Sequence, residues 1–100
     1  MTSTAQRSRT IIEAASKPGL PKHIKLRHDA GRGRWLVLAP ERVFEPDEIA
    51  VEILKRCDGE RSVEAIAGEL AREYNAPLND ILKDTISMLQ ELSDKGVVKA

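Results

Sequence analysis

The sequence contains little of what many small proteins use to stabilise a fold. Cys57 is the single cysteine, so the chain cannot form an intramolecular disulfide bond. The aromatic residues are also few, namely Trp35, Phe44 and Tyr74. No apolar run approaches the roughly 20 residues that span a membrane, and the N-terminus lacks the continuous apolar stretch of a secretory signal. These absences favour a cytoplasmic protein whose core consists of Ile, Leu, Val and Ala.

The chain does have a globular composition, with an uneven distribution of charge. Of its 100 residues, 41% are hydrophobic and 32% are charged, which fits a single domain. Residues 1–34 contain eight Lys or Arg and two acidic residues, whereas residues 35–100 contain eight basic and fourteen acidic ones. The simpler interpretation is mutual attraction between the two regions, and the functional one is a basic and an acidic surface for different partners.

The pattern divides the chain into a tail and one domain. Residues 1–20 are predicted to form a flexible N-terminal tail or linker, because Pro18, Gly19 and Pro21 interrupt the chain before any regular pattern begins. Residues 21–100 are expected to form the domain.

The first half of this domain predicts a three-stranded antiparallel sheet. The stretch from His23 to His28 alternates polar and apolar residues, as a half-buried strand does. Residues 35–39 are apolar at every position, which predicts a central strand covered on both faces. Pro40 then makes a tight turn, and residues 42–45 form a short third strand at the sheet edge.

The second half predicts three helices. The first begins near Pro46 and ends before Gly59, and the second begins at the capping residue Ser62. The third covers residues 77–95 and is closed by Gly96. The fold class is therefore α+β, with three antiparallel strands followed by three helices, and it is similar to a winged helix-turn-helix.

No catalytic residue, metal ligand set or cofactor site is predicted. Cys57 falls on an apolar helical stripe four residues after Ile53, which indicates a buried structural thiol rather than a nucleophile. His23 and His28 are an odd number of residues apart on one strand, so they face opposite ways and cannot share a metal ion. The pattern therefore favours a binding protein over an enzyme.

The helix-turn-helix makes a nucleic-acid-binding domain the first alternative. A recognition helix needs Lys and Arg to contact phosphates. The predicted third helix has two basic residues, Lys83 and Lys95, against four acidic ones: Asp80, Asp84, Glu91 and Asp94. A helix of this charge would be repelled by DNA, so no nucleic-acid partner is expected, and no membrane partner either.

The edge strand at residues 42–45 has two interpretations, and the pattern favours neither over the other. Its short length and its charged ends are typical of an edge protected from aggregation. The same edge could instead pair with an extended peptide, which would rest against the third helix. That helix has a wide apolar face, too wide for one small core.

Two motifs in this pattern resemble the pyrroloquinoline quinone biosynthesis protein D (PqqD) family. The first is Arg-Trp-Leu-Val-Leu-Ala-Pro-Glu-Arg at residues 34–42, and the second is Ile-Leu-Lys-Arg-Cys-Asp-Gly at residues 53–59. The two motifs are spaced along the chain as they are in the family, and the resemblance covers about residues 18–99. Residues 1–17 are a departure, because the family usually has no long tail. Within the motifs, Pro40, Asp58 and Gly59 are interpreted as structural.

The resemblance implies a peptide chaperone. Family members bind the ribosomal precursor peptide of the quinone cofactor and present it to a radical S-adenosylmethionine enzyme, which links a Glu and a Tyr side chain of that peptide. The peptide adds as a strand beside the third strand and contacts the third helix. An assembly subunit of the modifying enzyme, with no groove of its own, remains an alternative. By position, the resemblance assigns peptide binding to Arg42, Val43, Phe44, Glu45, Ile81, Leu82, Thr85, Ile86 and Leu89.

Overall fold

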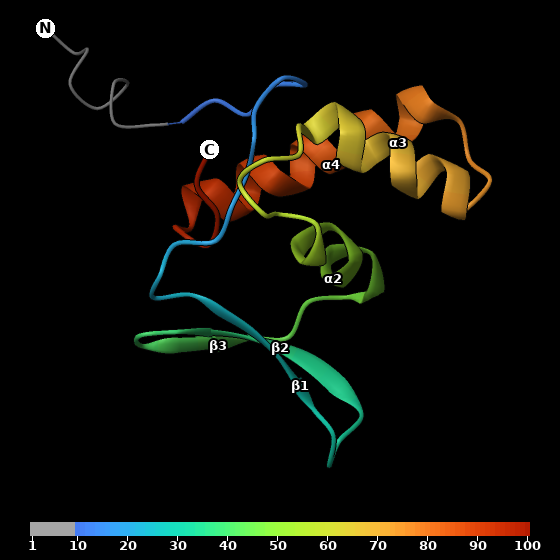
Figure 1. The fold of residues 1–100 in the computed structure, drawn as a ribbon. Coiled ribbons are helices and arrows are strands. Elements are labelled where there is room, and N and C mark those ends of the chain that lie inside the picture. The colour runs from blue at the N-terminus through green and yellow to red at the C-terminus, as the bar shows by residue number, and fades with distance from the viewer. Residues whose placement is uncertain (1–9) are drawn as a thin grey trace, which may run out of the picture.

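The computed structural model describes residues 10–100, with a sheet on one side and helices on the other (Figure 1). An antiparallel sheet in the order β1-β2-β3 is formed by β1 (Lys25–Asp29), β2 (Arg34–Ala39) and β3 (Arg42–Phe44). The helices that follow are α2 (Glu48–Lys55), α3 (Val63–Glu73) and α4 (Leu78–Asp94). The predicted fold class and the order of the elements are confirmed.

The ends of the helices follow local signals in the sequence. At the start of α2, the Asp47 carboxylate accepts a hydrogen bond from the Ala50 N–H, and Ser62 Oγ accepts one from the Ala65 N–H at the start of α3. After α4, Gly96 has a φ of 79°, which lets the chain turn back from the helix. The predicted cap at Ser62 and stop at Gly96 are confirmed.

The sheet has a buried inner face and an open outer face. Val37 of β2 is 2% exposed and packs with Phe44 and Leu26 against the core beneath the helices. Leu36 and Leu38 alternate with Val37, so they point to the outer face, where they stay half-buried. The prediction that β2 is covered on both faces is therefore wrong within residues 10–100. β2 is central because strands flank it, while the helices cover one face only (Figure 1).

The chain joins the folded domain earlier than the predicted boundary at residue 20. Ile12 is 4% exposed and belongs to the core. Its N–H donates to Gln90 Oε1 of α4 at 2.9 Å, and Gln90 Nε2 donates to the Thr10 carbonyl at 2.8 Å. The prediction of a tail that extends to residue 20 is corrected for residues 10–20, whereas its first nine residues lie outside the described part of the chain.

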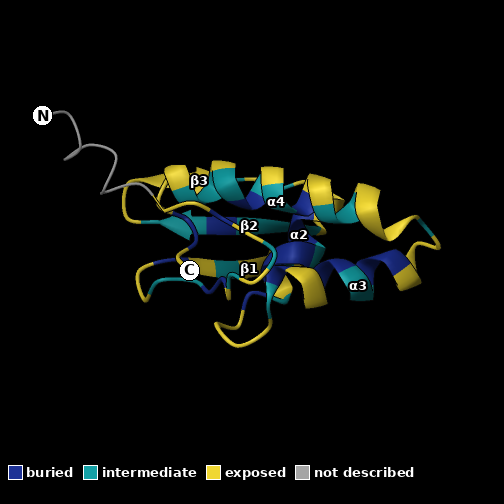
Figure 2. Cartoon of the chain, turned by 90° about the horizontal axis from the view of Figure 1, so that it is seen from above, coloured by how far each residue is buried: buried dark blue, intermediate teal, exposed yellow. Residues whose placement is uncertain are grey.

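The same segment completes the N-terminus of α3. The first N–H groups of a helix have no partner within the helix. Here the Ser16 carbonyl accepts the Val63 N–H at 2.8 Å, and the Ala14 carbonyl accepts the Glu64 N–H at 2.9 Å. Figure 2 shows buried residues in β2, α2 and α3. Residues 10–20 therefore stabilise the helical layer rather than trail from it.

This packing gives a direct test with neighbouring residues. We expect Ile12→Ala to lower the free energy of unfolding by roughly 2–4 kcal/mol, since it leaves a cavity in the core. Ile11→Ala is the matched control, because Ile11 is 57% exposed, and it should change stability by less than about 0.5 kcal/mol. Urea denaturation measures both. Equal effects of the two substitutions would contradict the packing of this segment.

Candidate functional site

The backbone at β3 has hydrogen-bonding groups that point away from the sheet. Ala39 and Arg42 are paired across the hairpin, and two residues separate them in the sequence. A two-residue connection makes this closing pair the hydrogen-bonded kind, so the next pair, Leu38 and Val43, does not exchange hydrogen bonds. The N–H and C=O groups of Val43 therefore point outward from the free edge. Among the described strands, none pairs with this edge.

A hollow lies beside this edge, between β3, α2 and the C-terminal half of α4. It has a volume of about 330 Å³. Its apolar lining consists of Val37, Phe44, Pro46, Ala50, Leu54, Met88, Leu92 and Val97. Charged residues stand at its rim: Glu45, Asp47, Glu91 and Lys95. We call it the strand hollow.

A second, smaller hollow of about 130 Å³ lies between α2, α3 and the N-terminal half of α4. It is lined by Ile49, Ile53, Leu70, Tyr74, Ile81, Asp84, Thr85 and Met88. We call it the helix hollow. Met88 lines both hollows, so the two adjoin along α4. We call the two hollows together the groove, which begins beside the open edge of β3 and is the candidate binding site.

The four predicted edge residues take different positions at this groove. Phe44 and Glu45 line the strand hollow, and Arg34 Nη1 donates to Glu45 Oε1 at 2.9 Å. The guanidinium of Arg42 lies 5.0 Å from the centre of the Phe44 ring and donates to the Lys95 carbonyl at 3.4 Å. Val43 shares the outer face with Leu38, so only its backbone is directed at the free edge.

The predicted residues of α4 are divided between the groove and the core. Ile81 and Thr85 line the helix hollow, although Thr85 is 1% exposed. Leu89 is fully buried in the core, while Leu82 and Ile86 are half-buried against the core and line neither hollow.

Sequence reasoning missed the residues that line most of the groove. Met88 and Leu92 continue the stripe of Ile81 and Thr85 at spacings of three and four residues. That spacing was the available signal, but a second stripe through Leu82, beside the first, obscured it. The wall provided by α2 had no local signal, because it depends on how that helix packs on the sheet.

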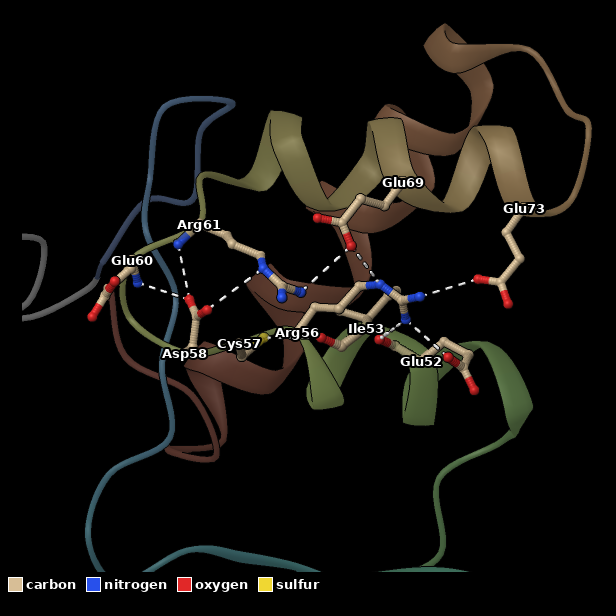
Figure 3. Close-up of polar contacts among 9 residues, drawn as sticks. All are labelled: Glu52, Ile53, Arg56, Cys57, Asp58, Glu60, Arg61, Glu69 and Glu73. Carbon is tan, nitrogen blue, oxygen red and sulfur yellow. Dashed lines mark hydrogen bonds and ion pairs between the residues drawn. The ribbon is translucent and has the colours of Figure 1, made fainter.

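A cluster of ion pairs holds α2 against α3 and so fixes one wall of the groove (Figure 3). Arg56, just after α2, contacts Glu52 of its own helix at 2.8 Å, and Glu69 and Glu73 of α3 at 3.0 and 3.1 Å. The hydrogen bond from Arg56 holds the pKa of Glu52 below its ordinary value of 4.5. Charge-assisted contacts to both helices from one rigid guanidinium restrict how the helices slide past each other.

The residues after Arg56 support the turn into α3. Asp58 accepts hydrogen bonds from the N–H groups of Arg61 and Glu60, which lowers the pKa of its carboxyl (Figure 3). Burial raises the pKa of the Cys57 thiol to about 12, and its Sγ donates to the Ile53 carbonyl at 3.2 Å. A thiol that stays protonated at neutral pH is a poor nucleophile. The cluster therefore has a structural role.

Two other kinds of site were sought among the described residues, a metal site and a membrane span. Within residues 10–100, no group of three or more His, Cys, Asp or Glu side chains is placed to hold a metal ion. None of the helices in this range is long and apolar enough to cross a membrane. The fold and groove define a winged-helix-type domain in which the β3 edge of the sheet is open beside an apolar groove, which is an arrangement for accepting an additional strand.

The comparisons with known proteins agree with this class. Residues 34–98 match the family described as coenzyme PQQ synthesis protein D (PqqD). A PqqA binding protein of Rhodopseudomonas palustris (strain BisB5) is 56% identical over 92 residues, which are 92% of this chain and 89% of that protein. A PqqA binding protein of Bradyrhizobium diazoefficiens (strain USDA 110) is 55% identical over 85% of this chain and 82% of that protein. This chain belongs to the PqqD family.

Two solved structures resemble the fold. The solution NMR structure of the PqqD truncation of Methylobacterium extorquens PqqCD is 37% identical, with a TM-score of 0.77 over 89% of this chain and 95% of that one. It is described as a functional, stand-alone recognition element for ribosomally synthesized and post-translationally modified products. The crystal structure of PqqD from Xanthomonas campestris is 40% identical, with a TM-score of 0.53 over 84% of this chain and 93% of that one.

The ion-pair cluster gives a pH-dependent prediction. Because folding lowers the pKa of Glu52, its contribution to stability is complete above pH 4.5 and is lost as the pH falls toward the folded-state value. We expect Glu52→Gln to make the free energy of unfolding less dependent on pH below about 4.5. The control is Glu60→Gln, since the Glu60 carboxylate has no ion pair among the described residues. Urea titrations between pH 3 and 7 measure this, and identical slopes for both variants would contradict it.

Proposed function

We propose that this domain binds the ribosomally made precursor peptide of pyrroloquinoline quinone as an added strand on β3. It then presents the peptide to the radical S-adenosylmethionine enzyme of the pathway. The observation that carries the proposal is the outward N–H and C=O of Val43, which lie at the mouth of an apolar groove. The names of the relatives support the choice of peptide, because they are PqqA binding proteins.

The groove explains how an added strand would be selected. A peptide beside β3 would lie about 4.8 Å from it, and alternate side chains would point to the same face as Phe44. That face contains the strand hollow, whose lining of Val37, Leu54 and Leu92 favours apolar side chains. The main-chain hydrogen bonds thus supply sequence-independent affinity, and the hollow supplies selectivity.

The proposed role is binding without catalysis. The described residues supply walls and backbone donors, and the buried Cys57 thiol has a pKa of about 12. The reaction on the peptide therefore belongs to the partner enzyme. We expect the complex to form in the cytoplasm, which suits a chain with a single, buried cysteine.

The nucleic-acid alternative is not favoured by the surface of α4. Asp80, Asp84 and Glu91 of this helix are exposed. Lys95, one of the two basic residues near the helix, lies 3.6 Å from Glu91, so part of the positive charge is neutralised. A groove lined by apolar side chains and an acidic helix accepts a peptide rather than a phosphate backbone.

Removing the outward N–H of Val43 tests the proposal. Val43→Pro removes this donor at an edge position that tolerates proline, so we expect peptide affinity to fall by about three- to ten-fold or more, which is the value of one hydrogen bond. Val43→Ala keeps the N–H and is the matched control, with affinity within about two-fold of wild type. Calorimetric titration with the precursor peptide measures both variants. Unchanged affinity in the proline variant would show that the peptide does not pair with β3.

A further inference from the structure

The outer face of the sheet contains an apolar patch that the groove does not explain. The strand register places Lys25 opposite Leu38, and Leu38 opposite Val43, in one row across the three strands. In the next row on the same face, Arg27 lies opposite Leu36. Val43 is 62% exposed, which is high for a large apolar side chain. We call these five residues the outer patch.

The two cations of the outer patch have no ion-pair partner within the described part of the chain. Neither Lys25 nor Arg27 has an acidic partner in residues 10–100, and both side chains are exposed. Two nearby arginines differ from them: Arg34 of β2 pairs with Glu45 at 2.9 Å, and Arg32 in the turn between β1 and β2 lies 4.0 Å from Asp29. The patch therefore combines an apolar centre with positive charge that the described chain does not neutralise, which is complementary to an apolar surface bordered by carboxylates.

The outer patch and the groove lie on opposite sides of the sheet. The helices and both hollows lie on the inner side of the sheet, and Figure 1 shows the outer side facing away from them. A protein on the outer patch would leave the groove open. It would still touch β3, because Val43 directs its side chain to the outer face and its backbone to the free edge. A partner held there is adjacent to any peptide paired with β3.

We propose that the outer patch is the docking surface for the peptide-modifying enzyme, through an apolar area on that enzyme bordered by Asp or Glu side chains. This proposal rests on the proposed function, since it assigns the partner of the same peptide complex. A second copy of this chain fits less well, because a two-fold contact through the outer patch would bring two copies of Lys25 and Arg27 into one interface. A nucleic acid would leave Leu36, Leu38 and Val43 without apolar contacts.

Reversing the charges of Lys25 and Arg27 tests the docking surface. We expect the double variant Lys25→Glu, Arg27→Glu to weaken binding to the radical S-adenosylmethionine enzyme by at least about ten-fold, through repulsion by its carboxylates. Affinity for the precursor peptide should stay within about two-fold of wild type. The matched control is Arg72→Glu with Lys83→Glu, which changes the net charge equally at exposed positions on α3 and α4. Calorimetric titrations with the enzyme and, separately, with the peptide measure both affinities.

The outcomes separate the two proposals. The docking surface would be overturned if the Lys25, Arg27 variant bound the enzyme as tightly as wild type, or if the control weakened enzyme binding equally. In either case, binding of the peptide by wild type would still support the groove. A wild-type chain that binds the enzyme but not the peptide would overturn the proposed function instead. Sedimentation velocity adds a further check: a wild-type dimer that the Lys25, Arg27 variant abolishes would assign the outer patch to a second copy and overturn its docking role.

Discussion

Peptide pairing with β3 depends on the register of one hairpin. The two-residue connection between Ala39 and Arg42 fixes which backbone groups of β3 bond to β2 and which point outward. A shift of one residue would turn the N–H of Val43 inward and move Phe44 from the groove to the outer face. Unpaired backbone groups at a sheet edge retain their capacity for hydrogen bonding, so the edge is suited to pair with another strand.

The rest of the fold keeps a firm wall beside that edge. Arg56 links α2 to α3 through three carboxylates, and residues 10–20 contact both α3 and α4. An isolated β-bridge between Gly19 and Lys99 adds a further link, since the N–H of each donates to the carbonyl of the other at 2.7 and 2.8 Å. A groove whose walls are held in place needs less ordering when a ligand binds, which favours affinity.

The sequence predicted the elements well because their signals are local. Caps such as Ser62 and the alternation around the strands depend on a few neighbouring residues. The packing of Ile12 against α4 could not be predicted, since it joins residues 78 positions apart through Gln90. The apolar run of β2 was misinterpreted, because its pattern does not distinguish a covered outer face from one left open for a partner. Likewise, two overlapping stripes on α4 concealed which one lines the groove, so the predicted set included Leu89 of the core and omitted Met88.

The most direct test of the central claim is amide hydrogen exchange by NMR, with and without the precursor peptide. The Val43 amide points outward, so it should exchange rapidly in the free protein and slowly in the complex. The Phe44 amide is an internal reference, because it already bonds to β2 in the free protein. Protection of Val43 on binding is the predicted result. Rapid exchange of Val43 in a saturated complex would contradict pairing of the peptide with β3.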